Sequence, residues 1–342
     1  MVETLLTRRG VLRLGAAAPL TLAGWGLAGC GAPSPRLLGC RGDLPAAWSS
    51  RLPRPWQVLL LDEPAAVGRS IAAGPGSSAG GRPALLQLSD GWAADLPPTA
   101  LQPIGTAALL ARLDPLAGPV SRLFRATSGP ALAFPWAVNP WVLVLRDRPD
   151  LARRRAAGWD LLLDPSLRGR VVLPASPRLS LALVAEDPER LRRLRAQALA
   201  YDDRDAISLL LDGHAEAAVL PRQRVVPLLR RDPRLTVVLP EQGGPLGWNL
   251  LLSPAAAPAP PLDWLAEVLE SPLLPRLLAG GWVPPLPAAQ LEPALAGFAP
   301  DLRALLLPPA ALQARWRDLP PLEPAERRRL QALWDGAAPP AP

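Results

Sequence analysis

The stretch PERLRRLRAQALAYDDRDAISLLLDGHAEAAVL, residues 188–220, decides the fold class. Residues 188–199 place leucines on one face and arginines on the other, which is typical of an amphipathic helix. Residues 206–211 predict a second helix, which Gly213 ends. The apolar run at 217–220 then predicts a buried strand. Helices followed by a strand within one stretch indicate an α/β fold.

Short apolar runs bounded by Pro, Gly or Asp recur along the chain and predict further strands. These runs are residues 56–62, 83–88, 131–135, 142–145, 171–173, 235–239 and 250–252. Ser89, Asp90 and Gly91 predict a turn, because Ser, Asp and Gly are common turn residues. Strands that alternate with helices indicate an α/β fold with mostly parallel sheets.

The apolar segments form two sets, separated near Trp141 and again near Leu239, which predict two lobes joined by two crossings of the chain. The predicted parts are lobe 1 at residues 44–140 plus 240–298, lobe 2 at 141–239, and a helical, Pro-rich C-terminal extension at 299–342.

The composition argues against an enzyme. The 46 Pro and 27 Gly residues make about a fifth of the 342 residues, below the roughly 25–30% typical of low-complexity disorder. His214 is the single His, in a Gly-containing turn, and there are two Cys residues. Gly-x-Ser-x-Gly, P-loop and Gly-x-Gly-x-x-Gly motifs are absent from the sequence. We therefore expect no catalytic residue, no metal and no cofactor.

The net charge of +7 does not predict nucleic-acid binding. All 37 basic residues are arginine, a bias that a GC-rich genome produces. The arginines are scattered among acids, and no basic face with interleaved aromatic residues is present.

The first 29 residues are predicted to be an export signal. Arg8 and Arg9 precede an apolar run at 14–27 that ends in small residues and is shorter than the about 20 residues of a membrane span. The arginine pair resembles the twin-arginine signal, and residues 27–30 resemble a bacterial lipobox. Lipidated Cys30 would then hold the chain at the periplasmic face of the cell membrane. The alternative is a hydrophobic N-terminal helix with a chance Cys.

Residues 30–43 are expected to be a Pro/Gly-rich tether. Residues 37–40 are a second, poorer lipobox, because the stretch before them is not apolar. Cys40 is therefore expected to be an unpaired thiol. Removal of residues 1–29 takes away three Arg and one Glu, which leaves a charge of 7 − 2 = +5.

An ordered set of segments resembles the bacterial extracellular solute-binding proteins of ABC importers, in the spermidine/putrescine-binding group. The segments are residues 85–92, 101–104, 134–139, 158–171, 211–218, 239–245 and 281–285. The resemblance covers about residues 44–290. It implies a type 2 periplasmic-binding fold, in which two α/β lobes close at a hinge on a small solute. It also implies a monomer that serves ABC permease subunits.

The resemblance also implies where the solute binds. Trp136, Trp248 and Trp282 fall at or next to aromatic positions of the family's pocket, and Ser89 falls at a polar position. The alternative for each of these tryptophans is that it is a core residue. The alternative for Asp90 is that it is only a turn residue. The predicted ligand-binding residues are Ser89, Asp90, Trp92, Trp136, Asn139, Arg222, Trp248, Asn249 and Trp282.

The carboxylates that bind polyamines in this family do not carry over. An amide, Asn249, follows Trp248, and residues 175–179 contain no acid. Arg222 and Arg224 repel a polycation and suit a carboxylate or phosphate better, unless they belong to a solvated loop. We therefore expect a solute that is not a simple polyamine. The alternative is a non-binding, scaffolding lipoprotein that kept the two-lobe fold.

Overall fold

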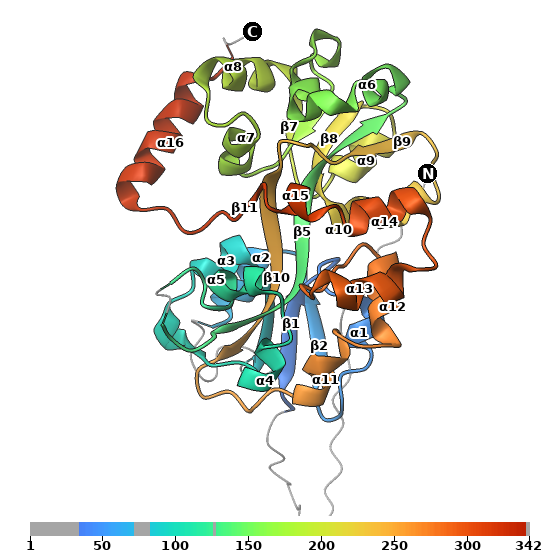
Figure 1. Cartoon of the computed structure of the whole chain (residues 1–342). Coiled ribbons are helices and arrows are strands. Elements are labelled where there is room, and N and C mark those ends of the chain that lie inside the picture. The colour runs from blue at the N-terminus through green and yellow to red at the C-terminus, as the bar shows by residue number, and fades with distance from the viewer. Residues whose placement is uncertain (1–33, 72–82, 126–127, 340–342) are drawn as a thin grey trace, which may run out of the picture. The chain divides into compact units, whose positions relative to one another are not determined.

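Short apolar segments that alternate with helices build one continuous sheet in the computed structural model, which describes residues 34–71, 83–125 and 128–339 (Figure 1). The described residues form one compact unit. Among the described residues eleven strands join the sheet, in the order β2-β1-β3-β10-β5-β8-β6-β7 with β4, β9 and β11 beside this path. The predicted α/β class is confirmed.

Two half-sheets share the long strand β5 (Ala133–Arg146). Residues 133–140 of β5 pair with β10, whereas residues 141–146 pair with β8 and β9. The first half-sheet contains β1 (Arg36–Cys40), β2 (Gln57–Leu61), β3 (Leu85–Ser89), β4 (Leu101–Gln102) and β10 (Gly244–Pro254). The second contains β6 (Val171–Leu173), β7 (Ala198–Tyr201), β8 (Ala217–Pro221) and β9 (Leu235–Val238).

Strand β5 corrects two predictions. The runs at 131–135 and 142–145 belong to one strand that continues from one half-sheet into the other. Because β10 is antiparallel to both β3 and β5, the sheet is mixed and not mostly parallel. The register of β5 on β10 shifts near Pro135, where a residue without a backbone N–H is best tolerated.

Strand β1 corrects the predicted tether. It pairs in parallel with β2 and β3, and Leu37 is fully buried. The apolar residues before Cys40 therefore belong to a sheet and not to a flexible linker. By contrast, β2 was expected to be buried, but it is the edge strand, and Leu59 is 42% exposed.

The helices cover both half-sheets, and none of those described is long and apolar enough to cross a membrane. Beside the first half-sheet lie α1 (Ala46–Ser49), α2 (Pro64–Arg69), α3 (Asp90–Ala94), α4 (Ala107–Leu110), α5 (Gly118–Ser121), α11 (Leu262–Glu267), α12 (Leu273–Ala279) and α13 (Ala288–Leu295). Beside the second lie α6 (Pro149–Arg153), α7 (Pro177–Leu183), α8 (Pro188–Gln197), α9 (Ala206–Leu211) and α10 (Arg222–Leu229). The predicted amphipathic helix is α8, which Asp187 caps at Arg190 N.

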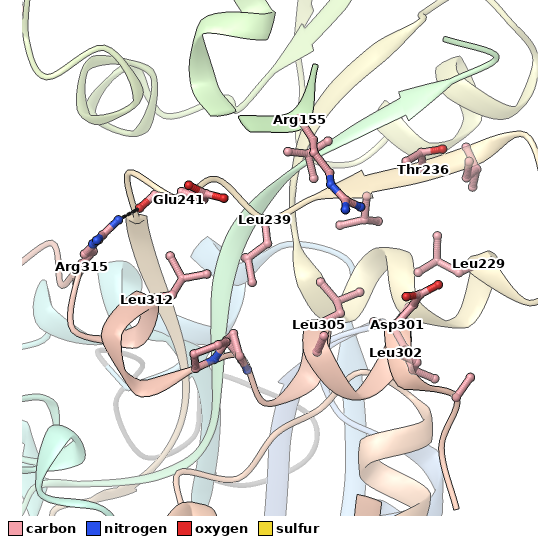
Figure 2. Close-up of a pocket in the computed structure, with 18 of the residues that line it drawn as sticks. Arg155, Leu229, Thr236, Leu239, Glu241, Asp301, Leu302, Leu305, Leu312 and Arg315 are labelled. Carbon is pink, nitrogen blue, oxygen red and sulfur yellow. Dashed lines mark hydrogen bonds between the residues drawn. The ribbon is translucent and has the colours of Figure 1, made fainter. Parts of the chain in front are cut away.

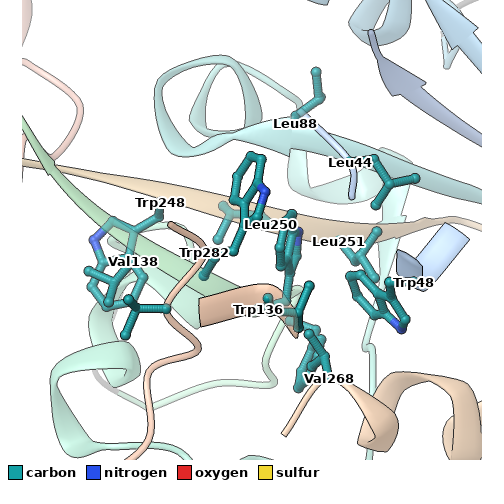
Figure 3. Packing of buried hydrophobic residues seen from close by; sticks show 14 of the residues in the cluster. Leu44, Trp48, Leu88, Trp136, Val138, Trp248, Leu250, Leu251, Val268 and Trp282 are labelled. Atoms are coloured by element: carbon teal, nitrogen blue, oxygen red, sulfur yellow. The ribbon is translucent and has the colours of Figure 1, made fainter. Parts of the chain in front are cut away.

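The indole rings of Trp48, Trp136, Trp264 and Trp282 form a ladder inside the first half of the molecule, and Figure 3 labels Trp48, Trp136 and Trp282. Trp48 stacks on Trp264 at 4.3 Å, and each indole N–H donates to the backbone carbonyl of the other residue. Trp136 lies 5.1 Å from Trp48 and 5.0 Å from Trp282. Such tilted and stacked pairs stabilise a core beyond the area they bury. The ladder therefore joins β5 to the helices α1 and α11.

The C-terminal extension is helical, as expected, but it also contains a strand. Its helices are α14 (Pro300–Leu306), α15 (Ala310–Gln313) and α16 (Pro324–Gly336). Between α15 and α16, β11 (Trp316–Arg317) pairs in parallel with Gly244 and Pro245 at the start of β10. A two-residue strand has no periodic signal in a sequence.

We expect Gly243→Ala to destabilise the chain by about 2–4 kcal/mol. Gly243 has a φ of +78°, and a Cβ there would lie 2.1 Å from the carbonyl oxygen of Arg315. The left-handed backbone costs about 1–2 kcal/mol for a non-glycine residue, and the clash with backbone beside β11 adds to it. Urea denaturation measures the loss. Gly42→Ala is the matched control, because Gly42 has a φ of +88° but a Cβ there would meet no described atom within 4 Å beyond its chain neighbours. Equal losses in the two variants would show that the contact with Arg315 is unimportant.

Candidate functional site

The topology brings the carboxyl ends of both half-sheets to one junction. Strand β5 runs in the same direction as β1, β2 and β3, because β10 is antiparallel to both β3 and β5. It is antiparallel to β8, which is parallel to β6, and β6 is parallel to β7. The strands on either side of the junction therefore end facing each other. Solutes in open α/β sheets bind outside the carboxyl ends of strands, so this junction is the candidate site.

Charged residues hold the junction together where β1 and β2 end. Arg204, which follows β7, donates to the Asp62 carbonyl at 3.2 Å, so this hydrogen bond links the two halves. Arg224 donates to the carbonyls of Asp203 at 2.7 Å and Arg204 at 3.1 Å. Burial raises the pKa of Asp43 to about 6, although the charge of Arg224 opposes this shift.

A second group of charged residues lies where β3 ends. Asp90 is buried at the start of α3, and its Oδ1 accepts a hydrogen bond from Trp248 N at 3.2 Å. Burial raises the pKa of Asp90 to about 7, and the charge of Asp318 adds to this increase. The Trp248 indole donates to Asp318 Oδ1 at 2.8 Å. Two carboxyl groups therefore contact one residue, Trp248.

Amide side chains form the polar face of the sheet beside these groups. Gln87 Nε2 donates to Asn249 Oδ1 at 3.3 Å, and Gln87 Oε1 accepts from Cys40 N at 3.3 Å. Asn249 on β10 pairs with Ser89. Gly247, two residues before Asn249 on β10, pairs with Asn139. Because cross-strand partners share a face and so do alternate residues of a strand, Asn139 lies on the face of Ser89 and Asn249.

Asn139 is the most informative residue of this face. It is 1% exposed, and neither its Oδ1 nor its Nδ2 has a hydrogen-bond partner in the described part of the chain. An unpaired buried polar group costs about 1–3 kcal/mol, and such groups usually bind water or a ligand. Asn139 therefore marks a position, between the opposing strand ends, that suits a polar ligand.

The structure brings five of the predicted ligand-binding residues together at the junction. These are Ser89, Asp90, Asn139, Trp248 and Asn249. Trp248 takes part only through its backbone and indole N–H groups, because its ring is fully buried in the same apolar core as Trp136. Trp92 lies on α3 and is 44% exposed. The predicted turn at 89–91 is wrong, because Asp90 already begins this helix.

Three other predicted residues lie in the interior. Trp136 and Trp282 are 0% and 8% exposed and pack on each other in the indole ladder. The prediction that they wall a gap between lobes is wrong, and the alternative of core residues holds. Arg222 is 1% exposed and donates to the carbonyls of Val138, Leu305 and Leu306. It ties β5 to α14, and it is neither a pocket residue nor part of a solvated loop.

Sequence reasoning missed three charged residues of the junction as site residues. Asp43 fell in the predicted tether, and Asp318 fell in the unmatched extension. Arg178 lies in the first turn of α7 and donates to the carbonyls of Leu319 and Pro320 at 3.2 and 2.6 Å. Arg178 follows the predicted strand at 171–173, so the carboxyl end of that strand could have indicated it. Asp43 could not be found in this way, because β1 was missed. Cys30, the arginine pair and residues 30–33 of the tether lie outside the described residues.

A separate cavity of about 1100 Å³ lies between β9 and the helices α14 and α15 (Figure 2). Its walls are mostly apolar, with Leu239, Leu305 and Leu312 among them. Arg155 and Asp301 bring charges to it. None of the predicted ligand-binding residues lines this cavity. It is therefore distinct from the junction.

Comparison with solved structures shows the fold. One similar structure is the spermidine/putrescine ABC transporter substrate-binding protein PotD from Streptococcus pneumoniae, with a TM-score of 0.67 and 12% identity over 89% of this chain and 98% of that one. A second is an ABC transporter substrate-binding protein from Bradyrhizobium japonicum, with a TM-score of 0.63 and 14% identity over 88% of this chain and 98% of that one. A third is iron-bound HitA from Pseudomonas aeruginosa, with a TM-score of 0.60 and 16% identity over 89% of this chain and 98% of that one. No family model and no curated protein matches the chain. The chain thus has the fold of periplasmic binding proteins, as expected.

Proposed function

We propose that this protein is the substrate-binding component of an ABC importer and captures a small solute at the junction of the half-sheets. The observation that carries the proposal is the buried amide of Asn139, which has no hydrogen-bond partner among the residues that the structure describes and lies between strand ends that face each other. The fold supports it, since similar structures are described as ABC transporter substrate-binding proteins. The protein acts without catalysis, metal or cofactor, as a monomer that delivers its solute to permease subunits.

The N-terminal sequence supports an extracytoplasmic location. Residues 1–29 have the features of a twin-arginine signal peptide and Cys30 those of a lipidated residue. We propose that acyl chains on Cys30 hold the protein at the periplasmic face of the cell membrane. There the body of the protein meets both solute and permease.

The solute is not a simple polycation. Asp43 and Asp90 supply carboxyl groups to the junction, but Arg178, Arg204 and Arg224 lie among them. Cations in a desolvated site repel a polyamine and attract carboxylates or phosphates. A solute that carries an anionic or zwitterionic group fits this mixture best.

Thermal unfolding of the mature chain with amino acids, organic acids, phosphates and polyamines tests the proposal. A solute at one hundred times its Kd stabilises the folded state by about 2.7 kcal/mol, which is a clear increase in Tm. We expect at least one anionic or zwitterionic compound to give this increase, and Asn139→Ala to abolish it. Gln57→Ala on the exposed edge strand is the control that retains it. Tight spermidine binding would contradict the solute class.

A scaffolding lipoprotein is the second candidate. Residues 318–320 of the extension contact Trp248 and Arg178 at the junction, and Arg204 links its two sides. A site that its own chain fills permanently binds nothing. No thermal shift from any compound class, in the wild type and in variants that release the extension, favours this function.

A further inference from the structure

The segment between α15 and α16 crosses from one half of the molecule to the other. We name residues 314–323 the strap. Its start pairs with β10 through Trp316 and Arg317. Its middle, Asp318, accepts the hydrogen bond of the Trp248 indole at 2.8 Å. Both contacts are made to β10, which belongs to the first half-sheet.

The strap is also attached to the second half. Arg178 on α7 donates to the carbonyls of Leu319 and Pro320. Beyond the strap, α16 packs against α7 and α8 (Figure 1), and Leu330 and Ala337 are buried in the apolar core of that half. The strap therefore bridges the candidate site from β10 to α7.

Asp318 is the weakest point between two well-packed attachments. Helix α16 is held by buried apolar groups, by the guanidinium of Arg195 4.1 Å from the Trp334 ring, and by the ion pair of Arg329 with Glu186. The start of the strap is held by the buried Trp316 ring and by two residues of strand pairing with β10, whereas the Asp318 carboxylate makes a single hydrogen bond. Asp318 is the last strap residue that contacts β10 before the chain reaches α7, so rotation of the halves about β5 and β10 acts first on its bond to Trp248.

We propose that the strap is a latch: it closes the solute site, and the hydrogen bond of Asp318 with Trp248 keeps it closed. Asp318 fastens the strap to Trp248 only when the half-sheets are together. A solute then enters and leaves only after this hydrogen bond opens. The proposal rests on the proposed function for its role in binding, but the latch itself is a property of the protein without solute.

Hydrogen–deuterium exchange of the mature chain without solute tests the latch. A hydrogen bond to a charged group is worth enough to change a local opening equilibrium roughly tenfold or more. In Asp318→Ala we expect the amides of the strap to exchange at least tenfold faster, with α16 unchanged. Asp318→Asn keeps an acceptor for the indole and should stay within about threefold of the wild type. Asp263→Ala, at an exposed acid on α11, is the control.

Two results of this exchange experiment overturn the latch. One is unchanged exchange in the strap of Asp318→Ala. The other is an equal acceleration in α16, which shows that the whole extension loosens and that Asp318 is a structural residue. Arg178→Ala removes the contacts on the other side of the strap and should also speed exchange in the strap.

Stopped-flow binding of the solute found by thermal shift tests the role in binding. Because the latch closes the site with and without solute, Asp318→Ala should raise the association and dissociation rates about equally, by roughly tenfold. The Kd should then change by less than about threefold. Unchanged rates, or a weaker Kd with an unchanged association rate, overturn this role. If no solute binds, the proposed function fails, and the exchange result still decides whether the latch exists.

Discussion

Replacement of Arg222 by methionine is expected to lower the free energy of unfolding by about 3–5 kcal/mol. The guanidinium donates to the carbonyls of Leu305 and Leu306 at 3.1 Å each, and of Val138 at 2.9 Å. Methionine fills a similar volume but leaves these buried carbonyls without a hydrogen-bond donor, and each unpaired carbonyl costs about 1–3 kcal/mol of stability. Burial lowers the pKa of Arg222 to about 9, so the group is still charged at neutral pH.

One effect opposes this loss. Arg222 has no carboxylate partner among its contacts, and removal of a desolvated charge is favourable. The unpaired carbonyls outweigh this gain, because two of them belong to the last turn of α14, where backbone carbonyls have no partner within the helix. Arg222→Lys keeps the charge but cannot donate in a planar fork, so we expect an intermediate loss.

Chemical denaturation at neutral pH measures both variants. Arg231→Met is the matched control, since Arg231 is exposed and lies beyond the end of the same helix. If Arg222→Met loses no more stability than this control, Arg222 does not tie β5 to α14.

Asp90→Asn is expected to make the protein more stable than the wild type at pH 8, by up to about 4 kcal/mol. The pKa of Asp90 rises from 3.8 to about 7, chiefly because the group is buried, and each pKa unit corresponds to about 1.36 kcal/mol. A raised pKa means that the folded state holds a proton that the unfolded state releases. The stabilisation that protonated Asp90 gives the folded state is therefore complete below pH 4 and is lost as the pH rises through 7.

Urea denaturation at pH 5 and pH 8 measures this dependence. The wild type should lose stability between these values, and Asp90→Asn should lose less of it, because Asn stays neutral and still accepts from Trp248 N. Asp150 is a control of opposite sign, since Arg148 holds the pKa of this exposed carboxyl well below its usual range. Asp150→Asn should lower the stability equally at pH 5 and pH 8, because this carboxyl is ionised at both, and its curve should approach that of the wild type only in acid. A variant Asp90→Asn that is less stable than the wild type at pH 8 contradicts the assignment.

The sequence predicted most strands of the second half-sheet. Residues 171–173 and 217–220 are apolar runs between turns, and they are strands in the structure. Strand β1 was missed because Leu37, Leu38, Gly39 and Cys40 also fit the pattern of a lipobox. A local pattern cannot show that these residues pair with β2 and β3.

The candidate site was predicted in part, for a physical reason. Five of the predicted residues come together because strand pairing brings the strand ends on which they lie close to one another. They are Ser89, Asp90, Asn139, Trp248 and Asn249. Trp136 and Trp282 give the same signal in a sequence whether they line a pocket or a core. Asp318 reaches Trp248 only through the path of the extension, which no periodicity encodes.

The indole ladder gives this protein an optical signature. Trp48 and Trp264 lie nearly parallel, with an angle of 11° between their planes, and Trp136 and Trp282 extend the array. The planes of the tilted pairs meet at 54° for Trp48 and Trp136 and at 37° for Trp136 and Trp282. Transition dipoles that are close and skewed couple, so we expect an exciton couplet in the circular dichroism spectrum. The couplet should disappear when this core unfolds, and it should not change when the strap opens. One half of the protein thus carries an intrinsic spectroscopic probe of its own folding.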